Sequence, residues 1–338
     1  MTGTDAFAIV RAVHQAATLL VFGQLMFVLV VARPASRGDG VSMRAFERRM
    51  RRIAGSALAV SLLAAIAWLG LEASRMSGLS LADAAGGEVL STVLLQTLFG
   101  KVWISRIVLG TALGAALWTG RRRAIAGARL AGKLELVLAA LYLGTLSLVG
   151  HSVGGTGLAR DGRVGFDAVH LLAAGAWLGA LPGLALLLAL AWRAQIERMF
   201  VVAAAATRRF SALGICCVGL LVASGIANAW YLVGSPMALG DTRFGRLLLA
   251  KLVLFAAMVA LAAHNRLRVS PRVEMHGPAA LRSLVRNART EIALGIAVVA
   301  VVGWLGISSP ADHMRPMPVL ATASPGDAVA HPARAGMP

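Results

Sequence analysis

The chain alternates long apolar stretches with short polar connections, and this pattern predicts its fold. At a rise of about 1.5 Å per residue, each stretch is long enough to cross a hydrocarbon layer roughly 30 Å thick. The stretches are residues 7–32, 53–73, 102–119, 134–151, 166–191, 211–233, 247–265 and 291–307. A backbone that spans lipid must satisfy its own hydrogen bonds, and no barrel-like alternation is present. We therefore predict an all-α polytopic membrane protein with eight transmembrane helices.

The composition agrees with this class. The 338 residues are 58% hydrophobic and 14% charged, and the mean hydropathy is +0.75. A soluble domain could not bury so large an apolar fraction. The chain is therefore expected to cross a membrane several times.

The net charge of +18 is distributed unevenly along the chain, and this distribution predicts the membrane topology. Of the 33 Lys and Arg residues, 22 lie in four segments, 33–52, 120–133, 192–209 and 266–289. Positive loops remain cytoplasmic, so these segments are predicted to be cytoplasmic and both termini periplasmic. The basic loops are expected to contact anionic membrane lipid, and no nucleic-acid partner is expected.

The chain contains an internal repeat. Ala12-Val13-His14 returns as Ala168-Val169-His170, 156 residues later, and Phe99-Gly100-Lys101 with Arg106 is paralleled by Phe244-Gly245-Arg246 with Lys251. Four spans in each copy keep both copies in one orientation, which predicts two parallel four-helix repeats about an axis along the membrane normal. The predicted units are residues 1–152 and 153–310. Residues 311–338 form a periplasmic tail that is expected to be disordered.

Three histidines gather near the predicted outer face. His14 and His170 occupy matching places in the first and fifth spans, and His151 ends the fourth. Ionisable side chains inside a membrane are costly and commonly serve a function. A neutral imidazole that holds two helices together is the competing interpretation. Recurrence at equivalent places favours a ligand-binding role for His14 and His170, with help from His151.

Copper is one ligand that suits these residues. Imidazole binds copper, zinc, iron and nickel, and thioether sulfur selects Cu(I). The C-terminal tail combines a carboxylate, an imidazole and thioethers and could load copper from the periplasm. Its candidate residues are Asp312, His313, Met314 and Met317.

Haem b is the second ligand to consider, because facing histidines on transmembrane helices can hold its iron. Arg106 and Lys251, one in each repeat, could then contact the propionates. Both could instead extend to the lipid headgroups, or pair with Glu72.

Other polar residues inside the spans each allow two interpretations. Cys216 and Cys217 are small core residues or a Cu(I) thiolate pair. Glu135 and Glu291 either pair with loop arginines or form a proton relay. Copper could move inward past Met26, Asn228 and the cysteines. The sequence has no catalytic triad, paired catalytic carboxylates or nucleotide-binding motif, so no enzymatic activity is expected.

The second half of the chain resembles the CopD copper-resistance domain of bacterial inner membranes, over about residues 205–310. The segments that carry this resemblance are Thr242–Met258, Ala262–Arg266, Pro271, Glu291–Ile296 and Gly306–Pro310, preceded by His151–Gly179. The resemblance implies a role in copper homeostasis beside a periplasmic copper chaperone of the CopC type.

Together these features predict a protein that takes up copper from the periplasm and moves it across the inner membrane. Two alternatives stay open. One is a haem b electron carrier that uses the same histidines, and the other is a membrane interaction or sensing protein that binds no metal.

Overall fold

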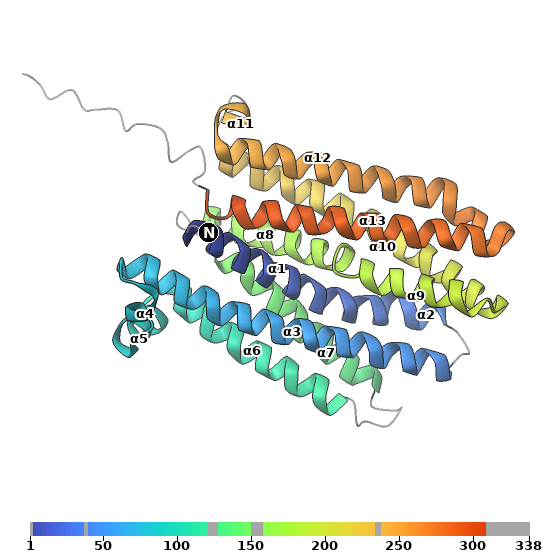
Figure 1. The fold of residues 1–338 in the computed structure, drawn as a ribbon, viewed down its shortest axis with the longest axis horizontal. Helices are drawn as coiled ribbons and strands as arrows, with labels where there is room; N and C mark the ends of the chain where they lie inside the picture. The colour runs from blue at the N-terminus through green and yellow to red at the C-terminus, as the bar shows by residue number, and fades with distance from the viewer. Residues whose placement is uncertain (1–2, 37–39, 121–127, 150–157, 234–237, 309–338) are drawn as a thin grey trace, which may run out of the picture.

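The structure is a computed structural model that describes residues 3–36, 40–120, 128–149, 158–233 and 238–308. Across these ranges the chain forms helices and no strand. Eight of the helical segments are long and apolar enough to cross a membrane, which confirms the predicted class. The long helices lie side by side as one bundle (Figure 1).

The first half of the chain supplies four spans and two short helices that connect the second span to the third. Its elements are α1 (Gly3–Met26) with the π-helical η1 (Phe27–Ala32) and α2 (Arg33–Ala35), α3 (Gly40–Ser77), α4 (Leu81–Ala84), α5 (Gly87–Gln96), α6 (Leu98–Gly120) and α7 (Ala128–Gly144) with the 3₁₀ turn η3 (Thr145–Leu148).

The second half supplies the other four spans. Its elements are α8 (Leu158–Trp177), α9 (Leu181–Ala194), α10 (Glu197–Val233), α11 (Ala238–Asp241), α12 (Arg243–His264) with the short turns η5 (Asn265–Val269) and η6 (Ser270–Arg272), and α13 (Val273–Leu305).

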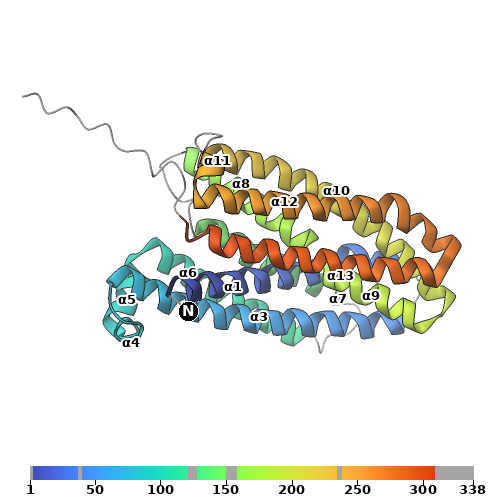
Figure 2. The same ribbon diagram turned by 45° about the horizontal axis from the view of Figure 1, so that its top comes forward.

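Helix α1 lies at the centre of the arrangement. It packs against α3 and α7 of its own half and against α8 and α13 of the other. The start of α1 meets the end of α13, where Arg11 Nη1 donates a hydrogen bond of 3.0 Å to the carbonyl of Gly306. The first helix therefore begins, and the last helix ends, at the same end of the bundle (Figures 1 and 2).

Corresponding helices pair in the two halves. Helix α1 packs on α3 as α8 packs on α10, and α6 packs on α7 as α12 packs on α13. These pairings are those that two four-helix repeats would make. The duplication itself, its symmetry axis and the periplasmic location of the termini stay predictions.

The fifth span differs from its expected form. The sequence predicted one apolar helix over 166–191, but α8 ends at Trp177 and α9 begins at Leu181. Pro182 occupies the first turn of α9, a position where its missing N–H costs no helical hydrogen bond. The span is thus interrupted partway along its length.

The interruption lies where α1 crosses it. A Cβ atom on Gly23 would overlap the carbonyl carbon of Gly179, and one on Gly179 would overlap the carbonyl oxygen of Leu19. Gln24 Nε2 also donates a 2.7 Å hydrogen bond to the Gly179 carbonyl. Small residues allow this backbone approach, and the amide satisfies a carbonyl that the broken helix leaves free.

We predict that Gly23→Ala destabilises the protein by about 1–3 kcal/mol, because the added methyl group has no space at the crossing. The thermal unfolding midpoint of the purified protein in detergent would measure the effect. Gly219→Ala on α10 is the matched control, since a Cβ atom there meets nothing within 4 Å. Equal midpoints for Gly23→Ala and wild type would contradict the close contact.

Candidate functional site

His14 lies fully buried in α1, and both of its ring nitrogens are engaged. Nδ1 lies 2.8 Å from the carbonyl oxygen of Ser61 on α3, and Nε2 lies 2.6 Å from Nη2 of Arg106 on α6. A carbonyl can only accept and a guanidinium can only donate. Nδ1 therefore carries the proton, and the lone pair of Nε2 accepts from Arg106.

Arg106 is itself buried, with 1% of its surface exposed. Its Nη1 donates to the carbonyl of Tyr142 at 2.9 Å and to Oγ1 of Thr145 at 2.5 Å. The guanidinium also lies over the Tyr142 ring, 4.5 Å from its centroid. Within the described residues, Arg106 is thus turned into the bundle. It does not pair with Glu72 there, and it does not extend outward as a headgroup contact would require.

Hydroxyl and aromatic groups close the space around His14. Thr18 Oγ1 donates to the His14 carbonyl at 2.8 Å, and hydroxyl contacts of 2.9 Å join Thr18 to Ser61 and Ser61 to Tyr142. The rings of Trp68 and Trp103 pack against the imidazole, with centroids 5.6 and 5.8 Å away. This network couples α1, α3, α6 and α7 and leaves no open coordination position on His14.

His170 has a different environment. It is half-buried in α8, and its Nδ1 lies 3.0 Å from Oγ of Ser224 on α10. The Ser224 hydroxyl donates to the carbonyl of Leu220 at 2.5 Å, so the hydroxyl oxygen is left to accept from Nδ1. This assigns the proton to Nδ1, and among the described residues no hydrogen bond to Nε2 is recorded.

Two charged residues accompany His170. Lys251 of α12, the predicted counterpart of Arg106, is close enough to interact electrostatically with both His170 and Asp167. Asp167 precedes His170 by three residues on α8, so the two lie on one helix face. The charge of Lys251 thus has an acidic neighbour, whereas the contacts of Arg106 described above are with neutral groups.

The two histidines face different groups of helices. The neighbours of His14 belong to α1, α3, α6 and α7, and those of His170 to α8, α10 and α12. No contact between the two imidazoles is described, so a single site that uses both of them stays a prediction. Among the described residues no three His, Cys, Asp or Glu side chains gather as a metal cluster.

Several other candidates lie outside the described residues. These are His151, Asp312, His313, Met314 and Met317.

The residues of the predicted inward path are scattered. Cys216 is exposed and Cys217 buried, both as free thiols, and Met26 and Asn228 are half-buried on α1 and α10.

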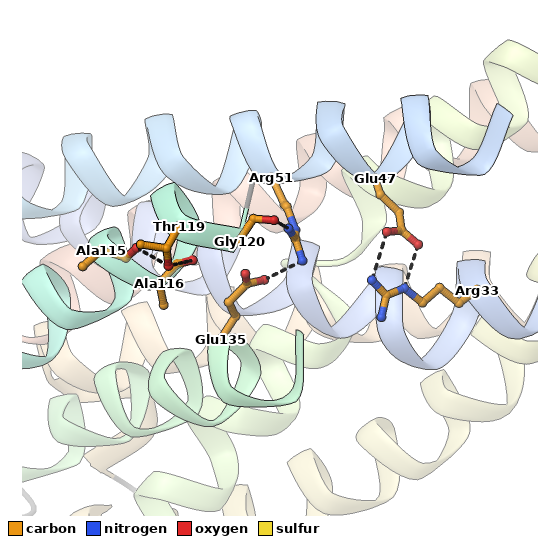
Figure 3. Close-up of polar contacts among 8 residues, drawn as sticks. All are labelled: Arg33, Glu47, Arg51, Ala115, Ala116, Thr119, Gly120 and Glu135. Atoms are coloured by element: carbon orange, nitrogen blue, oxygen red, sulfur yellow. Dashed lines mark hydrogen bonds and ion pairs between the residues drawn. The ribbon is translucent and has the colours of Figure 1, made fainter. Parts of the chain in front are cut away.

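The carboxylates of α7 and α13 have different partners. Arg51 on α3 pairs with Glu135 at 3.2 Å and donates to the carbonyl of Gly120 at 2.9 Å (Figure 3). Glu291 instead accepts a 2.7 Å hydrogen bond from the amide of Asn265. An ion pair is therefore described for Glu135, while the described hydrogen bond of Glu291 comes from a neutral amide.

Sequence reasoning named the histidines but missed their anchors. Ser61 and Ser224 are hydroxyl residues flanked by apolar residues inside the predicted spans, each on the helix that packs against its histidine. Gln24 and Gly179 were also missed as a pair. Polar residues isolated inside a span were the available signal, since each needs a partner within the protein.

Comparison with known proteins identifies the family to which this chain belongs. A family model described as "Copper resistance protein D-like, N-terminal domain" matches residues 1–161, and one described as "Copper resistance protein D" matches residues 204–305. Copper resistance protein D of Pseudomonas syringae pv. tomato is 30% identical over 86% of this chain and 93% of its own length. The chain belongs to the copper resistance protein D family.

Two further relatives support this assignment and the location. Inner membrane protein YebZ of Escherichia coli K12 is 30% identical over 89% of this chain and 97% of its own. Copper transport protein CutJ of Bacillus subtilis 168 is 26% identical over 78% of this chain and 47% of its own. No solved structure gives a significant match. The protein is thus a multi-pass inner-membrane protein of copper homeostasis, and the family match extends to the first half, beyond the residues that carried the resemblance.

We predict that Arg106→Leu destabilises the protein by at least about 2 kcal/mol, because His14, Tyr142 and Thr145 lose a charged donor inside the bundle. Thermal unfolding in detergent would measure the change. Lys101→Leu, on the exposed surface of the same helix, should have a much smaller effect. Equal losses in the two variants would show that the buried network contributes nothing specific.

Proposed function

We propose that this protein takes up copper on the periplasmic side and moves it across the inner membrane, with His170 as a ligand at the entrance and no enzymatic step. Support comes from membership of a copper resistance family and from a relative named as a copper transport protein. The sequence adds the charge pattern that places His170 near the outer face.

The observation that carries the proposal is Nε2 of His170, for which the described residues supply no hydrogen bond, while Nδ1 is held by Ser224. Metal-binding histidines commonly fix one ring nitrogen by a hydrogen bond and coordinate through the other. Ser224 holds Nδ1 of His170 in this way. His14 has both nitrogens engaged, so in our proposal it organises the bundle and binds copper only if Arg106 moves away.

The donor of copper in this proposal is a periplasmic copper chaperone of the CopC type. Copper would pass from the chaperone to His170, with His151 and the tail residues Asp312, His313, Met314 and Met317 as the further ligands to test. A copper site with few ligands suits transfer from the chaperone, because the ligands of the chaperone can be replaced one at a time by those of this protein.

Inward movement would pass the interruption between α8 and α9. Interrupted helices in transporters accompany substrate sites near the middle of the bilayer. Here the interruption offers the Gly179 carbonyl and Gln24, whose Oε1 is buried without a hydrogen-bond partner among the described residues. These are oxygen groups with no charge of their own, which suits a transient position rather than tight binding.

The haem alternative requires both histidines to face one iron. The described contacts put the two histidines among different helices and engage both nitrogens of His14. These contacts favour copper over haem. An absorption spectrum of the purified protein without a Soret band is the expected result.

We predict that His170→Ala weakens copper binding by at least tenfold and that Ser224→Ala weakens it by about tenfold, since outer partners of ligating histidines contribute about 10- to 100-fold. Competition between the purified protein and a chromogenic Cu(I) chelator would give both affinities. Copper accumulation by cells that produce each variant would report transport.

His264→Ala is the matched control, because His264 is an exposed histidine near the other end of the bundle. It should bind copper as the wild type does. The proposal fails if His170→Ala folds normally and retains the affinity of the wild-type protein. His14→Ala separates the two roles, because it should lower the unfolding midpoint more than it lowers copper affinity.

A further inference from the structure

A large apolar groove runs along the outside of the bundle between α3 and α13, with α1 as its floor. Its volume is about 1070 Å³, at the upper end of the range for ligand sites, roughly 300–1,000 Å³. Figure 2 shows α3, α1 and α13 side by side on this face. On the floor, Ala16 and Ala17 leave space between the larger Val13, Leu19 and Leu20, and Val60 and Ile296 lie on the walls.

One end of this groove is strongly basic. Arg48, Arg49 and Arg52, on the first half of α3, all line it and are all exposed. None of the three forms an ion pair with a described carboxylate. The acidic residues nearby are used on the other side of α3, where Arg33 pairs with Glu47 and Arg51 with Glu135 (Figure 3).

The length of the groove matches one leaflet. From Arg48 to Val60, α3 rises roughly 18 Å, close to half of a hydrocarbon layer about 30 Å thick. Three guanidinium groups at the membrane surface and an apolar channel of that depth match the two parts of a phospholipid. Arginine binds phosphate oxygens well because its planar fork donates two parallel hydrogen bonds.

We propose that this groove binds one anionic phospholipid, with its phosphate on Arg48, Arg49 and Arg52 and an acyl chain lying along α1. The lipid belongs to the leaflet at the arginine-rich end, which the charge pattern assigns to the cytoplasm. Its acyl chain reaches Leu178, Gly179 and Pro182, which also line the groove. The bound lipid therefore packs against the interruption between α8 and α9 and helps to hold it in place.

Native mass spectrometry of the full-length chain in detergent tests this proposal. The protein would be titrated with phosphatidylglycerol and, separately, with phosphatidylcholine of the same acyl chains. The wild type should retain phosphatidylglycerol about tenfold more strongly. The triple variant Arg48→Gln, Arg49→Gln, Arg52→Gln should lose this preference, because each basic residue near a membrane surface adds to anionic-lipid affinity.

A charge-matched control is Arg266→Gln, Arg268→Gln, Arg272→Gln, which removes three exposed arginines that do not line the groove. It should keep the preference. Ala16→Phe fills the apolar channel and should weaken retention of both lipids, whereas Ala59→Phe, exposed on α3 outside the groove, should not. If the triple variant does not fold, Arg48→Gln and Arg52→Gln alone should each lose part of the preference.

Any of three lipid-binding results would overturn the proposal: equal retention of the two lipids by the wild type, equal loss in both triple variants, or displacement of the lipid by inorganic phosphate alone. A dimer that covers the groove and is abolished by Ala16→Phe would also overturn it, since the occupant would then be a second copy of the chain. None of these measurements involves copper, so the lipid proposal and the copper proposal can fail separately.

Discussion

A polar group inside a lipid bilayer must find its partners within the protein, and Arg106 shows how strongly this constraint shapes the fold. Its guanidinium is buried, and its two Nη atoms donate to His14, Tyr142 and Thr145, none of which is acidic, while Nε has no hydrogen-bond partner among the described residues. An unsatisfied group in hydrocarbon costs several kcal/mol. Helices α1, α6 and α7 are therefore held at fixed positions around one cation, and α3 joins them through Ser61.

The same constraint separates two histidines that look equivalent in the sequence. His14 and His170 sit in matching tripeptides, and each bonds a seryl residue on the next span. The difference comes from the cation, because Arg106 donates directly to the imidazole of His14, while His170 is described with the Ser224 hydroxyl and the Leu221 backbone as hydrogen-bond partners. Both nitrogens of His14 are thereby engaged, whereas no hydrogen bond to Nε2 of His170 is described within the ranges that the structure covers. In our proposal this difference assigns packing to His14 and copper binding to His170.

The sequence predicted the number and the type of spans because length and hydropathy decide both. It did not predict the interruption at 178–180, because hydropathy averaged over a span hardly changes when Gly179 and Pro182 end one helix and begin another. It also could not show the state of each ring nitrogen. That state depends on Ser61 and Arg106, which lie 47 and 92 positions from His14 and meet it only after the helices pack.

Helix α1 links these features, since it carries His14 on one face, Gly23 and Gln24 at the crossing, and Ala16 and Ala17 in the groove. Buried hydrogen bonds of His14 tie the first half of this helix to α3 and α6. At the crossing, the α8–α9 segment touches it through backbone contact and one amide hydrogen bond. The α8–α9 side is thus the less constrained partner at the crossing, and it is where our copper proposal would require a rearrangement if the metal is to pass His170 while the network around His14 is kept.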